Sequence, residues 1–142
     1  MDERYSKIKP EKLLSIVFRR EDAEKESVGG KDITPESCYL QVRFLKTDLN
    51  KVFKAHKHLP QKRITELTQE SLIVLQGSVE ISIYDLDDSF LDKFILNPGD
   101  CVITLDGGHS IKILKENTFL YEHKNGPYNG LEKDKEFINE NV

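Results

Sequence analysis

The chain has 142 residues with 37% hydrophobic content, enough for one domain with a sizeable core and short for two. We therefore predict a single domain over residues 1–142. The net charge is -4, and the Lys and Arg residues are scattered among Asp and Glu instead of being gathered into a stripe. This pattern gives no indication of nucleic-acid binding.

Two further features bear on location. No apolar stretch approaches the roughly 18 residues of a membrane span, and the charged start of the chain lacks the apolar segment of a signal peptide. Cys38 and Cys101 lie far apart and form no CxxC pair, which is typical of structural thiols in a reducing compartment. We predict a cytoplasmic protein that does not bind membranes.

Short apolar runs separated by turn residues dominate the chain. Helical period is confined to residues 11–15 and 134–141, and the polar stretch 20–37 indicates a long surface loop. The predicted strands, in chain order, are 13–19, 38–45, 52–58, 62–67, 70–76, 78–84, 92–96, 101–105, 109–114 and 118–124. So many short strands favour a closed barrel or two sheets, since closure removes unpaired strand edges.

Strand alternation directs four polar side chains inward. On the predicted strand 52–58, His56 and His58 lie opposite Lys57, and a lysine is more often the member that faces solvent. Glu70 and His109 each share a strand face with apolar residues. Polar groups directed into a small β-core are costly unless they are paired or bind something.

The first part of this pattern resembles the first motif of the cupin superfamily, which is a glycine, five residues, HxH, three or four residues, Glu, six residues and Gly. Asn50, His56, His58, Glu70 and Gly77 match it in order. Two departures stand out: eleven residues separate the second histidine from the glutamate, and asparagine replaces the first glycine. Asparagine is a residue type that accepts the left-handed turn conformation.

The second part resembles the second cupin motif. Residues 98–100 (PGD) are followed by the turn 107–108 (GG) and by His109, but Leu105 stands where proline is usual and Ile113 where asparagine is usual. The closing stretch HKNGPYNGLEKDK is similar to the tail of a little-characterised single-domain cupin subgroup with HxH, TQE, GGH and GPY segments.

This resemblance implies an all-β double-stranded β-helix, the cupin jelly-roll barrel. Its core would span about residues 38–124, after an N-terminal strand and loop (1–37) and before a tail (125–142) that wraps the barrel or crosses to a partner chain. The resemblance also implies a divalent transition metal, Fe, Mn, Ni or Zn, with the ligands His56, His58, Glu70 and His109. The competing interpretation pairs Glu70 with Arg63 or a lysine and leaves the histidines as ordinary wall residues.

Three classes of function follow from the resemblance. The first is a metal-dependent dioxygenase or isomerase that acts on a small molecule, with a leaning towards sugar or polysaccharide metabolism. The second is a metal-free cupin similar to nucleotide-sugar isomerases and epimerases, and the third is a non-enzymatic ligand-binding module. Arg63, Tyr121 and His123 are further pocket candidates. We also predict a homodimer, because the apolar outer face at Ile73 and Leu75 needs covering.

Overall fold

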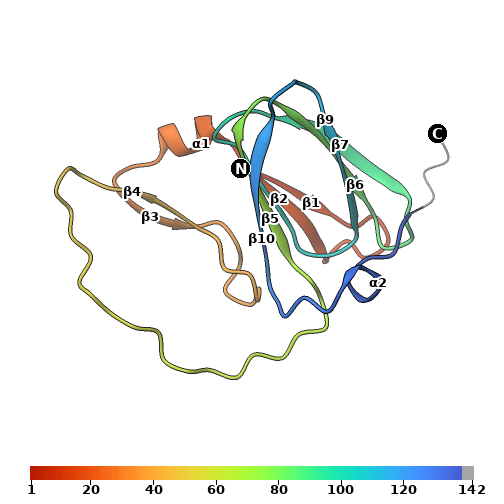
Figure 1. Ribbon diagram of the computed structural model, residues 1–142, viewed down its shortest axis with the longest axis horizontal. Coiled ribbons are helices and arrows are strands. Elements are labelled where there is room, and N and C mark those ends of the chain that lie inside the picture. The colour runs from red at the N-terminus through yellow and green to blue at the C-terminus, as the bar shows by residue number, and fades with distance from the viewer. Residues whose placement is uncertain (139–142) are drawn as a thin grey trace.

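A computed structural model gives the fold, and it describes residues 1–138 (Figure 1). The chain is mostly β, with 39% of residues in strands and 7% in helices. Five strands form the larger sheet, in the order β1 (Asp2–Tyr5), β2 (Leu13–Phe18), β8 (Cys101–Thr104), β5 (Glu70–Gln76), β10 (Phe119–Lys124). Three strands form the second sheet, in the order β7 (Phe90–Leu96), β6 (Val79–Tyr84), β9 (Gly108–Ile113).

The remaining elements are small. They are the ribbon of β3 (Gly29–Asp32) and β4 (Arg43–Lys46), and the helices α1 (Arg20–Lys25) and α2 (Leu131–Asp134). Every strand pair is antiparallel, so the all-β prediction is confirmed. Within the described residues no sheet closes into a barrel. Neither of the two helices has the length and apolar character needed to cross a bilayer.

The two larger sheets pack face to face around the main core. Alternate residues of each strand point into this space, as the two-residue period of a strand requires. Its fully or nearly fully buried members are Val17, Leu72, Val74, Val79, Ile81, Ile83, Phe94, Leu96 and Val102. The result is a sandwich with a strongly apolar interior.

A second core covers the outer face of the larger sheet. Ile16, Phe18 and Ile103 point to that face, and the segment 33–44, which ends at the start of β4, packs over them. The rings of Phe18 and Phe44 lie 5.4 Å apart between centroids. β2 and β8 are therefore buried on both faces, which explains why each is a near-continuous apolar run.

This packing bears on the homodimer prediction, which assumed that the outer face at Ile73 and Leu75 needs a partner to cover it. Ile73 is half-buried against the second core, whereas Leu75 remains 40% exposed. The chain itself covers part of that face. The case for a homodimer must therefore rest on other surfaces.

Seven of the predicted strands are present with small shifts at their ends: 13–19, 70–76, 78–84, 92–96, 101–105, 109–114 and 118–124. Of the predicted strand 38–45, only the end overlaps β4. The predictions at 52–58 and 62–67 are wrong, because residues 47–69 contain neither strand nor helix. Alternation shows which face a strand would present, but it does not supply a neighbouring strand to pair with. Pro60, between the two predicted strands, has no backbone N–H to donate.

Errors also occur near both ends of the chain. The predicted loop 20–37 contains α1 and β3, and the predicted helical turn at 11–15 is wrong because β2 begins at Leu13. β2 is also an interior strand of the larger sheet, so the core begins well before residue 38. The predicted C-terminal helix at 134–141 is replaced by α2 a turn earlier, and its end lies outside the described residues.

The core assignment predicts the cost of truncating Ile81, which is fully buried. Ile81→Ala should lower the free energy of unfolding by about 2–5 kcal/mol, because it removes buried methyl groups and leaves a cavity. Ile95 lies on the neighbouring strand β7 and is 47% exposed. Ile95→Ala should therefore cost much less in urea denaturation, and equal losses in the two variants would contradict the assignment of faces.

Candidate functional site

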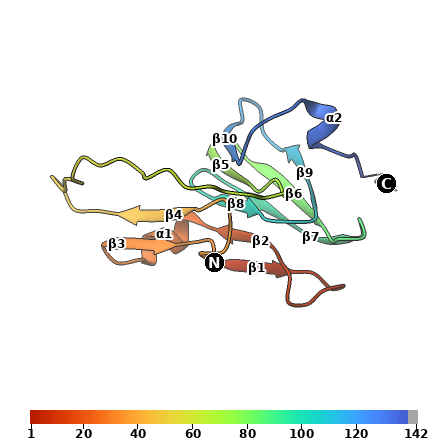
Figure 2. The ribbon, with the colours of Figure 1, turned by 90° about the horizontal axis from the view of Figure 1, so that it is seen from below.

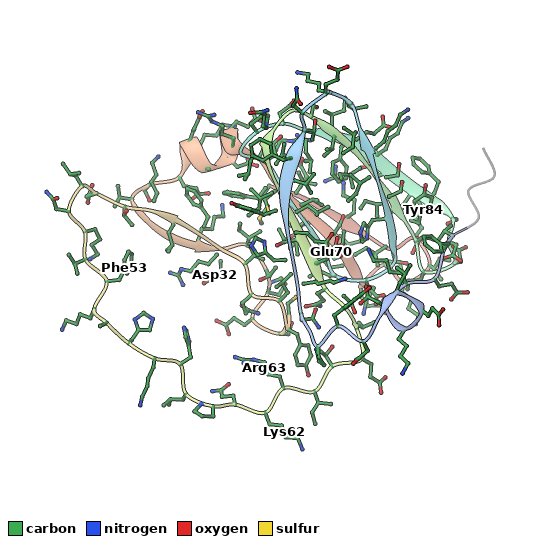
Figure 3. All side chains as sticks on the ribbon, in the orientation of Figure 1. Asp32, Phe53, Lys62, Arg63, Glu70 and Tyr84 are labelled. Atoms are coloured by element: carbon green, nitrogen blue, oxygen red, sulfur yellow. The ribbon has the colours of Figure 1, made fainter. Side chains whose placement is uncertain are left out.

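Glu70 begins β5 in the interior of the larger sheet. Its backbone lies opposite Thr104 of β8 on one side and Lys124 of β10 on the other. The side chain is 5% exposed and lies between the two larger sheets (Figure 3). Pairing on both sides thus fixes a carboxylate at the end of the sandwich.

His109 reaches the same point from the second sheet. It lies on β9, opposite Ile83 of β6, and its Nε2 atom is 3.2 Å from Oε1 of Glu70. The preceding Gly107 has a φ of +71°, and a Cβ there would lie 2.5 Å from the carbonyl oxygen of Tyr84. Only glycine fits that turn without strain, so the GG pair before the histidine has a clear steric role.

The two side chains line a cavity of about 490 Å³. Hydroxyl groups come from Thr104 and Ser110, and apolar surface comes from Tyr84 and Ile111. Residues 134–138, which follow the start of α2, form another part of the wall. The cavity therefore combines a central carboxylate–imidazole contact with a mixed polar and apolar lining, as small-molecule sites commonly do.

The protonation of Glu70 reflects opposing influences. Burial acts to raise its pKa, whereas the imidazole of His109 and the ammonium groups of Lys135 and Lys124 act to lower it. The net effect holds the pKa of Glu70 below its ordinary value of 4.5. The group is thus an anion at neutral pH in spite of its burial.

One oxygen of this carboxylate remains short of partners. Oε1 of Glu70 is buried, and no donor of residues 1–138 meets it in full hydrogen-bond geometry; Nε2 of His109 lies within reach at 3.2 Å but is poorly aligned. Most buried polar atoms in native proteins do have a donor or acceptor. The exception identifies Oε1 as an acceptor available to a bound molecule.

Two other acidic groups of the cavity lining are paired with lysines. Asp106 pairs with Lys12 at 2.7 Å, and Asp134 pairs with Lys124 at 2.8 Å. The second pair fastens α2 to β10. The charge of Glu70 is therefore balanced mainly by His109 and, at longer range, by Lys135 and Lys124.

Two of the four predicted metal ligands come together and two do not. Glu70 and His109 are in contact, but His56 and His58 lie in the exposed segment 47–69, which loops away from the sheets (Figure 1). The two exposed imidazoles form an edge-on pair with centroids 5.5 Å apart, and Nδ1 of His56 lies 2.8 Å from the carbonyl oxygen of Lys54. The strand that was to carry them is not formed.

The residues gathered at the cavity do not fit the predicted four-ligand metal site. Within residues 1–138, no three His, Cys, Asp or Glu side chains are placed so that they could hold one metal ion. The competing interpretation, in which Glu70 pairs with Arg63 or a lysine, is nearer to the structure, because Glu70 does contact a basic side chain. Its partner, however, is His109, and Arg63 lies in the exposed segment (Figure 3).

The other pocket candidates are also displaced from the cavity. Tyr121 is 61% exposed on β10, its ring packs edge-on against His123 with centroids 6.2 Å apart, and neither residue lines the cavity. Sequence reasoning missed Thr104, whose signal was a hydroxyl residue within an apolar strand. It also missed residues 134–138, which carry no recognisable signal.

Comparison of the chain with protein-family models, with curated proteins and with solved structures finds no match.

The lowered pKa of Glu70 predicts how its substitution acts at different pH values. Since the folded-state pKa lies below 4.5, the carboxylate contributes stability that is fully present above that pH and is lost as pH falls through the folded-state pKa. The free-energy difference between wild type and Glu70→Gln in urea should therefore shrink as pH is lowered below 4.5. Glu11→Gln, at an exposed position, should follow the wild-type curve, and a difference independent of pH would contradict the assignment.

Proposed function

We propose that the chain binds a small, hydroxyl-rich molecule such as a sugar in the cavity between the two larger sheets, and that Glu70 and His109 act on it as an acid–base pair. One observation carries this proposal. A buried carboxylate oxygen that lacks a hydrogen-bond donor lies 3.2 Å from an imidazole nitrogen in a cavity of about 490 Å³. Hydroxyl groups of a ligand would supply the missing donors.

The lining favours a ligand without charge. Hydroxyl groups of Thr104 and Ser110 can exchange hydrogen bonds with a sugar, and Tyr84 offers an aromatic wall. Lys12 and Lys124 are paired with Asp106 and Asp134, and Lys135 of the lining is outnumbered by the carboxylates of Glu70 and Glu136, so the cavity has no excess positive charge to attract a phosphate. These features support a free sugar or polyol over a nucleotide-sugar.

The pair has the chemistry needed to move a proton. The anionic Glu70 can accept a proton from a carbon next to a carbonyl group, and a protonated His109 can donate one to the carbonyl oxygen. Glu70 would then deliver its proton to the former carbonyl carbon while the neighbouring hydroxyl group returns a proton to His109, which completes an isomerisation of the substrate and restores both side chains. This activity corresponds to the metal-free class of function that the cupin resemblance implies. The fold of the chain would then be a jelly roll whose two sheets stay open at one side.

Binding and proton transfer can be measured separately. Saturation-transfer NMR with a panel of neutral monosaccharides and polyols should detect binding, and proton NMR in D₂O should show deuterium entering the carbon next to the carbonyl. Glu70→Gln should keep much of the binding, because the amide still offers an oxygen, but should lose the exchange by a factor of about 10²–10⁴.

His123→Gln is the matched control, since His123 lies on β10 outside the cavity. It should leave both signals unchanged. Binding without exchange in the wild-type protein would identify a non-enzymatic ligand-binding module. A Glu70→Gln protein that keeps both ligand binding and deuterium exchange would overturn the proposed site.

Metal binding stays a prediction with its own test. His56 and His58 would have to approach Glu70 and His109 through a rearrangement of residues 47–69. Elemental analysis of protein purified without a histidine tag should then find one divalent metal per chain, lost in His56→Ala and kept in Lys57→Ala. Equal metal content in the two variants would remove the four-ligand hypothesis.

A further inference from the structure

Residues 51–66, here called the basic arm, run in extended form without a partner strand. They lie between β4 and β5 and swing away from both sheets (Figures 1 and 2). Each residue of an unpaired extended chain exposes a backbone donor and acceptor, which is the state that a sheet edge can satisfy. The arm is thus a strand-like segment that lacks a sheet.

The arm also carries much exposed apolar surface. Val52 is 79% exposed, Phe53 58%, Leu59 75% and Ile64 66%. Figure 3 shows Phe53 on the arm, far from the sandwich core. Such a concentration in one segment is characteristic of surface that is buried by a partner.

The arm and the rest of the chain have net charges of opposite sign. The arm holds five Lys and Arg residues and one Glu, whereas the other residues hold 16 Lys and Arg against 24 Asp and Glu. The arm is therefore basic on an acidic body. A second copy of this chain offers the complementary charge.

The sandwich has one open side that could receive the arm. β9 and β10 are edge strands, each paired on one side only within the described residues. The opposite side is closed, because Arg4 of β1 pairs with Asp92 of β7 at 2.9 Å and stacks over the ring of Phe94. No ion pair of that kind joins β9 to β10 in residues 1–138.

Of the two open edges, β10 suits a basic apolar segment better. It exposes Phe119 (51%) and Tyr121 (61%), and Glu122 supplies an exposed carboxylate, while the one lysine of β10, Lys124, is paired more closely with Asp134, at 2.8 Å, than with Glu122. β9 carries Lys112 and no acidic residue, so it would repel the arm. Aromatic and opposite-charge pairs across strands are both stabilising.

The direction in which the arm would run along β10 indicates that the arm comes from another molecule. The end of the arm is tied beside the end of β10, where Asn125 donates to the Leu67 carbonyl at 3.0 Å and accepts from the Gln69 N–H at 2.6 Å. A chain's own arm could therefore lie along β10 only in the parallel direction. Every strand pair of this fold is antiparallel, and a two-fold partner can supply that direction.

We infer that two copies of the chain exchange their basic arms, each adding the arm as a strand to the β10 edge of the other. The two contacts are equivalent, so the assembly closes as a dimer. This inference is independent of the activity proposed for the cavity.

Light scattering and cross-linking of the full chain test this inference. At tens of micromolar the protein should have twice the 16.4 kDa chain mass. A mixture of ¹⁴N- and ¹⁵N-labelled protein, treated with a carbodiimide, should give mixed-isotope links from Lys54 or Lys57 to Glu122. Glu122→Gln should remove these links.

A matched pair of arm variants separates strand addition from charge alone. Phe53→Pro with Lys57→Pro removes two backbone donors and should shift the mass to that of the monomer, whereas Phe53→Tyr with Lys57→Arg keeps the donors and the charge and should remain dimeric. The far-ultraviolet circular dichroism of the tyrosine–arginine variant should match wild type, whereas the proline variant should lose only the strand signal of the exchanged arm, since the arm holds no strand of the monomer.

Three results would overturn the inference: a wild-type monomer, links confined to single-isotope peptides, or a dimer that survives the proline variant. A monomer whose arm retains labelled RNA in a filter-binding assay would assign the arm to nucleic acid instead.

Discussion

The placement of β5 between β8 and β10 is the constraint on which the rest of the site depends. An interior strand cannot slide by one residue without moving its buried side chains to the opposite face. The register that buries Leu72 and Val74 in the main core therefore also sends Glu70 between the sheets. The carboxylate is buried because of the residues that follow it.

Burial of that carboxylate then imposes a demand on the second sheet. A charged group removed from water must be paired, or its pKa rises until it is neutral. His109 meets this demand from β9, and the glycine turn at 107–108 sets where β9 begins. The ion pair thus joins the two sheets at the cavity end, much as Arg4 and Asp92 join them at the opposite side.

The sequence predicted those parts of the fold whose signals are local. Apolar alternation located seven strands, and the motif residues Glu70 and His109 proved to be neighbours. Asn50, expected to accept a left-handed turn, has a φ of +63°. The errors have a common origin, because an alternating run such as 52–58 becomes a strand only where a neighbour is available, and neighbours are set by tertiary packing. His56 and His58 were placed wrongly for that reason.

The arm and the cavity are close in sequence but mechanically separate. Gln69 lies between them and is 7% exposed; its backbone N–H donates to Asn125, and its side-chain oxygen accepts from the Leu40 N–H at 2.9 Å. These two hydrogen bonds fix Gln69 between the arm and β5. Whatever the arm contacts, Glu70 keeps the register imposed by β8 and β10. The contact between Glu70 and His109 is therefore already formed in a single chain, and assembly is not needed to complete it.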